Sequence, residues 1–215
     1  SRALTDGGCR TVVLGADDEG PALALYRRLG FEMGETQRSL LLGGEAMRIR
    51  SELPADRAEV EALVRVAFAR SRESQLIEAL AGEPGVISLV AERAGTLLGH
   101  LLFSPVTVRD ADGSERQEIA LGPIAVRPSQ QGRGVGTALI DEGLQRCRQA
   151  GWKLAFVLGD PGYYQRFGWL RAADHRLNCR WDASGENFQV LELVPGGLAG
   201  CQGQVVYHCA FDAVG

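Results

Sequence analysis

The chain has 215 residues, 45% of them hydrophobic, and a formal net charge of −4 at pH 7. This length is enough to bury the core of one large domain, or of one domain and a smaller piece. The weakly acidic charge, with no long apolar run and no apolar leader, is not typical of a general nucleic-acid binder or a membrane protein, so we expect a soluble protein that binds neither.

From residue 46 to residue 126 the hydrophobic pattern predicts strands and helices in the order β-α-α-β-β-β. Pro54 is typical of the first turn of a helix, and Ala94-Gly95 is typical of a hairpin turn between two strands. The expected elements are a strand at 46–51, a helix from Pro54, a second helix around 76–80, and strands at 86–92, 96–109 and 118–126.

The rest of the chain begins with a glycine-rich loop and a helix that ends near Gly151. The elements expected after it are a strand at 152–159, a short helix and turn at 161–169, and tail strands at 188–193 and 204–211. Antiparallel hairpins that precede a single strand–loop–helix–strand unit predict a mixed α/β fold, whose central sheet is largely antiparallel and flanked by helices.

The loop places Gly132, Gly134 and Gly136 at alternate positions between a strand and a helix. Glycines remove the Cβ atoms that would keep a ligand away, and the unpaired amides and dipole of a helix N-terminus attract anions, so a polyphosphate is the expected ligand. The loop lacks the lysine of a Walker loop, and Leu139 stands where a dinucleotide fingerprint needs a third glycine. A plain strand-to-helix turn is the alternative.

The stretch "LGPIAVRPSQQGRGVGTALI" resembles the acetyl-CoA signature of the GNAT superfamily of N-acetyltransferases, with Gln131, Gly134 and Gly136 at its named positions. "YYQRFGW" resembles a later motif of that family, and "MRIRSELPADRAEVEALVRVAF" resembles its opening strand and helix. "GHLLFSPV", "VLGDPGYYQRFGW" and "LELVPGGLAG" resemble the YhbS-like branch, acetyltransferases of largely undefined substrate. The resemblance covers about 46–211 and is specific, because several motifs recur in order.

This resemblance implies a GNAT fold and acetyl transfer from acetyl-CoA, a co-substrate, to a primary amine of a small molecule or peptide, by direct attack and without a metal. The pantetheine arm is expected along Ile124, Ala125 and Val126. The pyrophosphate is expected on the amides of Gln131, Gly132, Arg133, Gly134, Val135, Gly136 and Thr137. A non-catalytic acyl-CoA-binding sensor or interaction module on the same fold is the alternative.

Direct transfer calls for a general acid and a general base. Tyr164 matches the tyrosine that is often the acid in the family, whereas Tyr163 is assigned to packing. Ala120 stands where some members hold a glutamate base, and Glu118 lies two residues earlier on the same strand face, so Glu118 is the expected base. A solvated carboxylate at Glu118, a base role for His100 and a water chain remain open alternatives.

Residues 1–45 are expected to be a partial GNAT domain, the C-terminal half of a second copy, and 46–215 a complete domain with a C-terminal strand extension. The basis is an internal echo, since "VVLGADDEGPALALYRRLGF" and "FVLGDPGYYQRFGW" share a strand ending in Val-Leu-Gly and a Tyr-x-Arg-x-Gly-aromatic motif. The expected protein partner is therefore a second copy or a missing first GNAT half. Five scattered cysteines without metal-site spacing predict reduced thiols and a cytoplasmic location.

Overall fold

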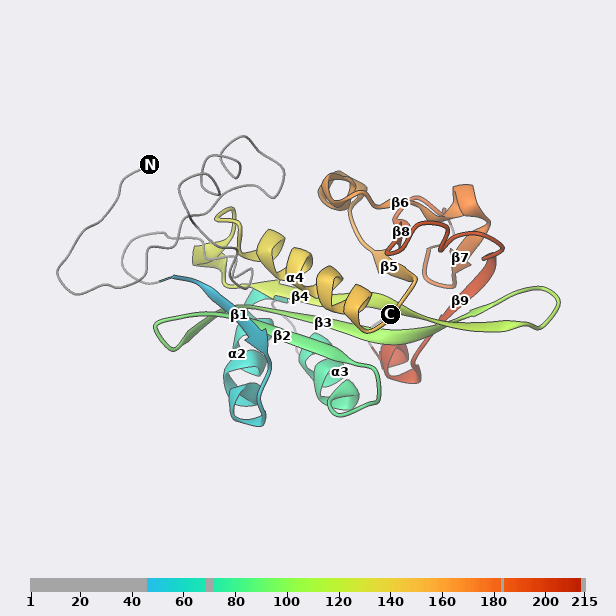
Figure 1. Ribbon diagram of the computed structural model, residues 1–215. Helices are drawn as coiled ribbons and strands as arrows, with labels where there is room; N and C mark the ends of the chain where they lie inside the picture. Colours follow the sequence, from blue (N-terminus) through green and yellow to red (C-terminus); the bar gives the residue numbers. More distant parts are fainter. Residues whose placement is uncertain (1–45, 69–71, 183, 214–215) are drawn as a thin grey trace, which may run out of the picture. The chain divides into compact units, whose positions relative to one another are not determined.

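The computed structural model describes residues 46–68, 72–182 and 184–213 (Figure 1). The predicted partial domain at 1–45 lies outside the described residues, so the division of the chain at residue 45 stays a prediction. Among the residues that the structure describes, no helix is both long enough and apolar enough to cross a membrane. The same residues contain no group of three or more His, Cys, Asp or Glu side chains that could hold a metal ion.

The elements follow the predicted order closely. The helices are α2 (Arg57–Phe68), α3 (Arg72–Leu80), α4 (Val135–Gln149) and α5 (Pro161–Tyr164). The strands are β1 (Arg48–Ser51), β2 (Ile87–Arg93), β3 (Thr96–Arg109), β4 (Glu115–Val126), β5 (Leu154–Leu158), β6 (Leu170–Arg171), β7 (Leu177–Cys179), β8 (Phe188–Glu192) and β9 (Gly203–Tyr207). The short strands β6 and β7 were not predicted, because two or three residues are too few to show an alternating pattern.

The nine strands of the described residues form one mixed sheet, and seven of them follow the order β1-β2-β3-β4-β5-β8-β6. The other two lie off this path, where β9 pairs with β3 and with β7. The pairs along this order are antiparallel except for the parallel pair β4–β5. The long strand β3 holds β4 along one edge, while β2 and then β9 share its other edge. The predicted mixed, largely antiparallel fold is therefore confirmed.

Helices cover both faces of the sheet, with α4 on one face and α2 and α3 on the other (Figure 1). The buried stripe of α4 consists of Val135, Leu139, Ile140, Leu144 and Cys147, which follow helical spacing. This stripe packs against apolar side chains of β2, β3, β4 and β5. The face behind it, toward α2 and α3, buries Val90, Leu97, Leu102 and Ala125.

The sheet opens between β4 and β5, where the pairing of these two strands ends. Their pairing ends at Leu121 and Val157, whereas β4 continues beside β3 as far as Val126, which lies opposite Gly99. Ile124–Val126 therefore keep one edge paired with β3, whereas the whole segment Gly122–Val126 has no partner toward β5 among the described strands. An unpaired strand edge offers backbone N–H and C=O groups to a ligand.

The tail departs from the prediction at residue 208. The predicted strand at 204–211 ends at Tyr207, opposite Val106 of β3, and residues Cys209–Ala213 form a short 3-10 helix. The next residue of β3 is Pro105, which has no N–H to donate, and beyond it β2 occupies this edge from Phe103. The chain therefore turns away, and Phe211 packs against the core beneath α2 and α3.

Candidate functional site

The glycine loop leaves the first amides of α4 without partners among the described residues. Gly134 precedes the helix with a φ of 83°, no side chain caps this end, and the first intrahelical bond runs from the Ala138 N–H to the Gly134 carbonyl at 3.0 Å. A Cβ atom built on Gly132 or Gly134 would meet no atom within 4 Å. The loop is therefore an open cradle of N–H groups with the positive end of the helix dipole behind it.

The two arginines that flank the loop differ in their availability. The guanidinium of Arg127 lies 2.9 Å from Glu59 of α2 and also donates to the Leu97 carbonyl. Arg133 is exposed and makes no ion pair with any described residue. Arg127 therefore fastens the end of β4 to α2, and Arg133 is the arginine free to meet a phosphate.

The residues predicted to hold the pantetheine arm and the pyrophosphate lie along the end of β4 and the loop that follows it. Ile124 and Val126 pack partly on the α4 side, while Ala125 is buried on the opposite side of the sheet. The Gln131 side chain donates to the Val126 carbonyl at 3.2 Å and so joins the end of β4 to the loop. The binding of a pantetheine arm along β4 and of a diphosphate on the amides from Gln131 to Thr137 stays a prediction.

Tyr164 is held at the far end of β5. Asp160 caps α5 by accepting a hydrogen bond from the Gly162 N–H at 2.9 Å, and Pro161 occupies the first turn. The Tyr164 ring packs edge-on against Trp169, with centroids 6.0 Å apart, and leaves 7% of the residue exposed. Burial, with a smaller contribution from Tyr163, raises the pKa of Tyr164 above that of a free phenol. The hydroxyl is therefore protonated at neutral pH and can donate a proton or a hydrogen bond.

Tyr163 has a closer connection to the loop than the sequence indicated. A Cβ atom on Gly136 would lie 2.8 Å from the Tyr163 hydroxyl and 3.6 Å from Val126. Arg166 stacks 4.7 Å from the centroid of the Tyr163 ring. The assignment of Tyr163 to packing alone was incomplete, because its hydroxyl reaches the first turn of α4. The signal in the sequence is Gly136 itself, a glycine within a helix where only a missing side chain makes room for the phenol.

Glu118 lies away from this arrangement. It is buried at the start of β5, where it accepts hydrogen bonds from the Lys153 and Leu154 amides at 3.1 and 2.7 Å and pairs with Arg116. Glu118 contacts the start of β5, whereas Tyr164 comes after its end. The two ends of this strand are about 13 Å apart along the extended chain. The expectation of a base at Glu118 gains no support from this geometry. The alternative of a solvated carboxylate is wrong, since 1% of the residue is exposed.

Replacing Glu118 with glutamine is expected to lower the free energy of unfolding by about 1–3 kcal/mol, because the amide cannot satisfy both backbone N–H groups and Arg116. Urea unfolding measures this change. The turnover of the folded variant should match the wild type well below the unfolding transition. A turnover that falls ~10²-fold or more with the stability intact would instead restore Glu118 as the base.

His100, the other base considered, contacts Ser88 and Glu52. It is fully buried, and its Nε2 lies 2.8 Å from the Ser88 Oγ and 3.2 Å from a Glu52 carboxylate oxygen. Burial raises the pKa of Glu52, but hydrogen bonds from His100 and Ser88 outweigh it and leave this pKa below its usual value. These three residues form a separate polar cluster beside a cavity at the β1–α2 connection.

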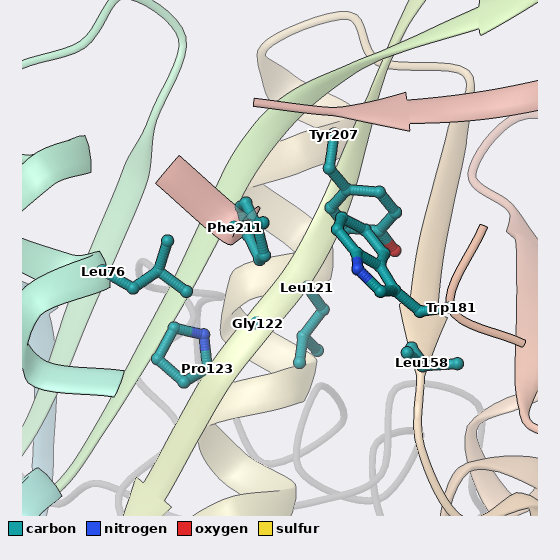
Figure 2. A pocket seen from close by; sticks show the side chains of 8 residues that line it. All are labelled: Leu76, Leu121, Gly122, Pro123, Leu158, Trp181, Tyr207 and Phe211. Carbon is teal, nitrogen blue, oxygen red and sulfur yellow. The ribbon is translucent and has the colours of Figure 1, made fainter. Parts of the chain in front are cut away.

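A second, apolar cavity opens where β4 and β5 separate (Figure 2). Its volume is about 420 Å³, and the described residues that line it are Leu76, Leu121, Gly122, Pro123, Leu158, Trp181, Tyr207 and Phe211. None of these carries a charge at neutral pH, since burial raises the pKa of the Tyr207 phenol. The tail thus contributes two of the aromatic walls. We call this space the apolar cavity.

Comparisons with known proteins identify the family and the fold. Residues 48–172 match the family model described as an acetyltransferase (GNAT) domain. The chain is 36% identical over 169 residues to the uncharacterized N-acetyltransferase YhbS of Escherichia coli K12, across 77% of this chain and 99% of that protein. It is similar to the crystal structure of E. coli YhbS in complex with CoA, with a TM-score of 0.74 and 34% identity over 82% of this chain and 97% of that one.

A second solved structure is a GNAT family acetyltransferase from Brucella melitensis in complex with acetyl-CoA. It has a TM-score of 0.64 and 39% identity, and the match covers 77% of this chain and 98% of that one. The resemblance to the YhbS-like branch is thereby confirmed on sequence, and the fold on structure. This chain belongs to the GNAT family of acetyltransferases.

Proposed function

We propose that this protein transfers the acetyl group of acetyl-CoA to a primary amine by direct attack of the amine on the thioester. The observation that carries the proposal is the open edge of β4 at Gly122–Val126. It connects the amide cradle at the start of α4 with the apolar cavity beside Leu121 and Leu158. Complexes of similar proteins with CoA and acetyl-CoA, as their names state, support acetyl-CoA as the donor.

The cofactor side and the acceptor side are assigned to opposite faces of the sheet. The N-terminus of α4 lies on one face, whereas Leu76 of α3 and Phe211 line the cavity on the other. A thioester that runs along the β4 edge would end near the cavity, with its pyrophosphate at the loop. The amine would then approach from the α3 side, opposite to the helix that holds the phosphates.

The chemistry requires one bond to form and one to break. The amine nitrogen forms a bond to the acetyl carbon, the carbon–sulfur bond breaks, and the sulfur leaves as a thiolate that needs a proton. Tyr164 is the proposed source of that proton or of a hydrogen bond to the sulfur. No described residue that lines the apolar cavity is a carboxylate or an imidazole, so the proton of the ammonium is proposed to leave through water.

The test is amine-dependent release of the CoA thiol from acetyl-CoA, with mass spectrometry of the acetylated product. The proposal expects thiol release in proportion to the acetylated amine. If acetyl-CoA binds but no small amine or peptide causes thiol release, the alternative of an acyl-CoA sensor is favoured. The lack of a base among the described cavity residues is the observation that favours a sensor.

Gly159 positions Tyr164. A Cβ atom on Gly159 would lie 2.5 Å from the Cε2 atom of the Tyr164 ring, so Gly159→Ala is expected to displace that ring. A misplaced catalytic group can cost ~10²-fold in rate, and we expect a loss of kcat of that order with unchanged binding of acetyl-CoA.

A double-mutant cycle shows whether this loss acts through the hydroxyl. If it does, Gly159→Ala combined with Tyr164→Phe should have the same kcat as Tyr164→Phe alone. Additive losses in the double variant would show that Gly159 acts by another route.

A further inference from the structure

We propose that the acceptor is a small amine carried on an apolar group, aromatic or branched, which binds in the apolar cavity with its nitrogen neutral. This inference rests on the proposed transfer to an amine and names the class of that amine. Its basis is the chemistry of the cavity walls beside the end of the β4–β5 pairing.

The described walls are uncharged and mostly apolar, and their polar side-chain atoms are the Tyr207 hydroxyl and the Trp181 ring nitrogen. Trp181 packs edge-on against Tyr207 with centroids 5.0 Å apart, and Tyr207 packs edge-on against Phe211 at 4.9 Å. Figure 2 shows these rings around the space beside β4, with Leu158 on the β5 side. A cavity of about 420 Å³ is at the small end of the ~300–1,000 Å³ typical of ligand sites, so it suits a small molecule.

Leu158 adds an independent sign of an apolar ligand. It is one of four large apolar residues that are exposed among the described residues, and 40% of it is accessible to solvent. Of these four, Leu158 alone lines the cavity, whereas Leu53, Val66 and Leu170 do not. An apolar group bound there would cover a leucine side chain that the protein leaves open.

The absence of charge from the described walls decides between amine classes. An ammonium group that leaves water needs a carboxylate or another partner, and burial without one favours the neutral amine. Polyamines and aminoglycosides carry several ammonium groups, and any that entered the cavity would meet described walls with no counter-charge. An amine with one nitrogen and an apolar body has the cost of losing only one proton. The burial of its apolar body contributes favourable hydrophobic free energy.

The experiment compares phenethylamine, ethylamine and spermidine as acceptors, with acetyl-CoA saturating. The hydrophobic free energy of burying a phenyl group should give phenethylamine a kcat/KM ~10–100-fold above that of ethylamine. Spermidine, which carries several charges, should be the poorest of the three. Leu158→Ala should lower kcat/KM for phenethylamine ~5–10-fold and leave that for ethylamine nearly unchanged. Leu170→Ala is the matched control, because Leu170 is 48% exposed and lies outside the cavity, and it should change neither value.

A charge placed on the wall should reverse the preference. Leu158→Glu is expected to raise kcat/KM for spermidine and to lower it for phenethylamine. The fold should stay intact, because Leu158 is already exposed. Spermidine preferred by the wild type, or equal effects of Leu158→Ala and Leu170→Ala, would overturn the inference while leaving amine transfer in place.

Calorimetric binding of phenethylamine to the CoA-bound protein separates this inference from the proposed function. Selective binding that Leu158→Ala weakens, without any turnover, would support the class of ligand and overturn the transfer reaction. Turnover without selective binding and without a selective kcat/KM would support the transfer reaction and overturn the proposed class of amine.

Discussion

Replacing Tyr164 with phenylalanine is expected to lower kcat ~10²–10⁴-fold, the usual effect of losing a general acid. The variant keeps the ring that packs against Trp169 and Gly159 and loses only the hydroxyl. Binding of acetyl-CoA should therefore be unchanged, because the proposed pyrophosphate site is the loop before α4. Stopped-flow or single-turnover measurement of thiol release shows whether the chemical step itself has slowed.

The raised pKa of Tyr164 refines the role that the sequence indicated. A free phenol titrates near ~10 and a free thiol near ~8.5, so proton transfer between them costs little in water. Burial raises the pKa of Tyr164 further, which makes complete transfer to the sulfur less favourable and keeps the phenol protonated in the resting enzyme. The kcat should therefore show no decline with rising pH below the ordinary phenol pKa of ~10.

Tyr163 supplies the matched control for this experiment. Its ring packs edge-on against the Tyr164 ring, with the ring centroids 5.0 Å apart, but its hydroxyl lies toward Gly136. Tyr163→Phe should change the KM for acetyl-CoA more than kcat, whereas Tyr164→Phe should do the opposite. If Tyr164→Phe turned over like the wild type under chemistry-limited conditions, Tyr164 would return to a packing role.

Substituting Gly134 with aspartate is expected to weaken CoA binding ~10²-fold or more, because a carboxylate would occupy the phosphate position and block hydrogen bonds from the amides to a charged ligand. No described residue beyond its chain neighbours lies within 4 Å of the new Cβ atom, and aspartate is a favoured residue before a helix. The fold should therefore survive, at a cost of about 1–2 kcal/mol for a side chain at a positive φ. Calorimetric titration with CoA measures the change.

Gly151→Asp is the control for that backbone cost. Gly151 follows the other end of α4, has a φ of 87° and also has no neighbour within 4 Å of a built Cβ atom. The same substitution there carries the strain and the charge without touching the loop, so CoA should bind it as it binds the wild type. Equal loss of affinity in the two variants would mean that stability, and not the phosphate site, accounts for the effect.

Local signals in the sequence predicted most of the fold and the loop. Alternating glycines between a strand and an amphipathic stretch with Leu139 and Leu144 predicted a loop followed by a helix, and the structure has both. The hairpin at Ala94-Gly95 and the parallel return after α4 fixed the mixed sheet. These features depend on residues close together in the chain, which a pattern can register.

Features set by distant contacts could not be predicted. The period of a strand places Glu118 on a face but cannot show that the Lys153 and Leu154 amides meet it there. The end of β9 depends on Pro105 and on β2, which are far from it in sequence. The aromatic walls of the apolar cavity come from separate segments of the tail, so no single motif indicates them.

The most direct test of the account is a crystal structure of the protein with CoA, because it locates the phosphates and the sulfur together. We expect diphosphate oxygens on the amides between Gln131 and Thr137, a pantetheine arm along Gly122–Val126, and the cavity beyond it. We also expect the sulfur within about 3.5 Å of the Tyr164 hydroxyl, at the mouth of the apolar cavity. A CoA whose phosphates lie away from the loop, or whose sulfur lies beyond the reach of Tyr164 and the cavity, would contradict these expectations.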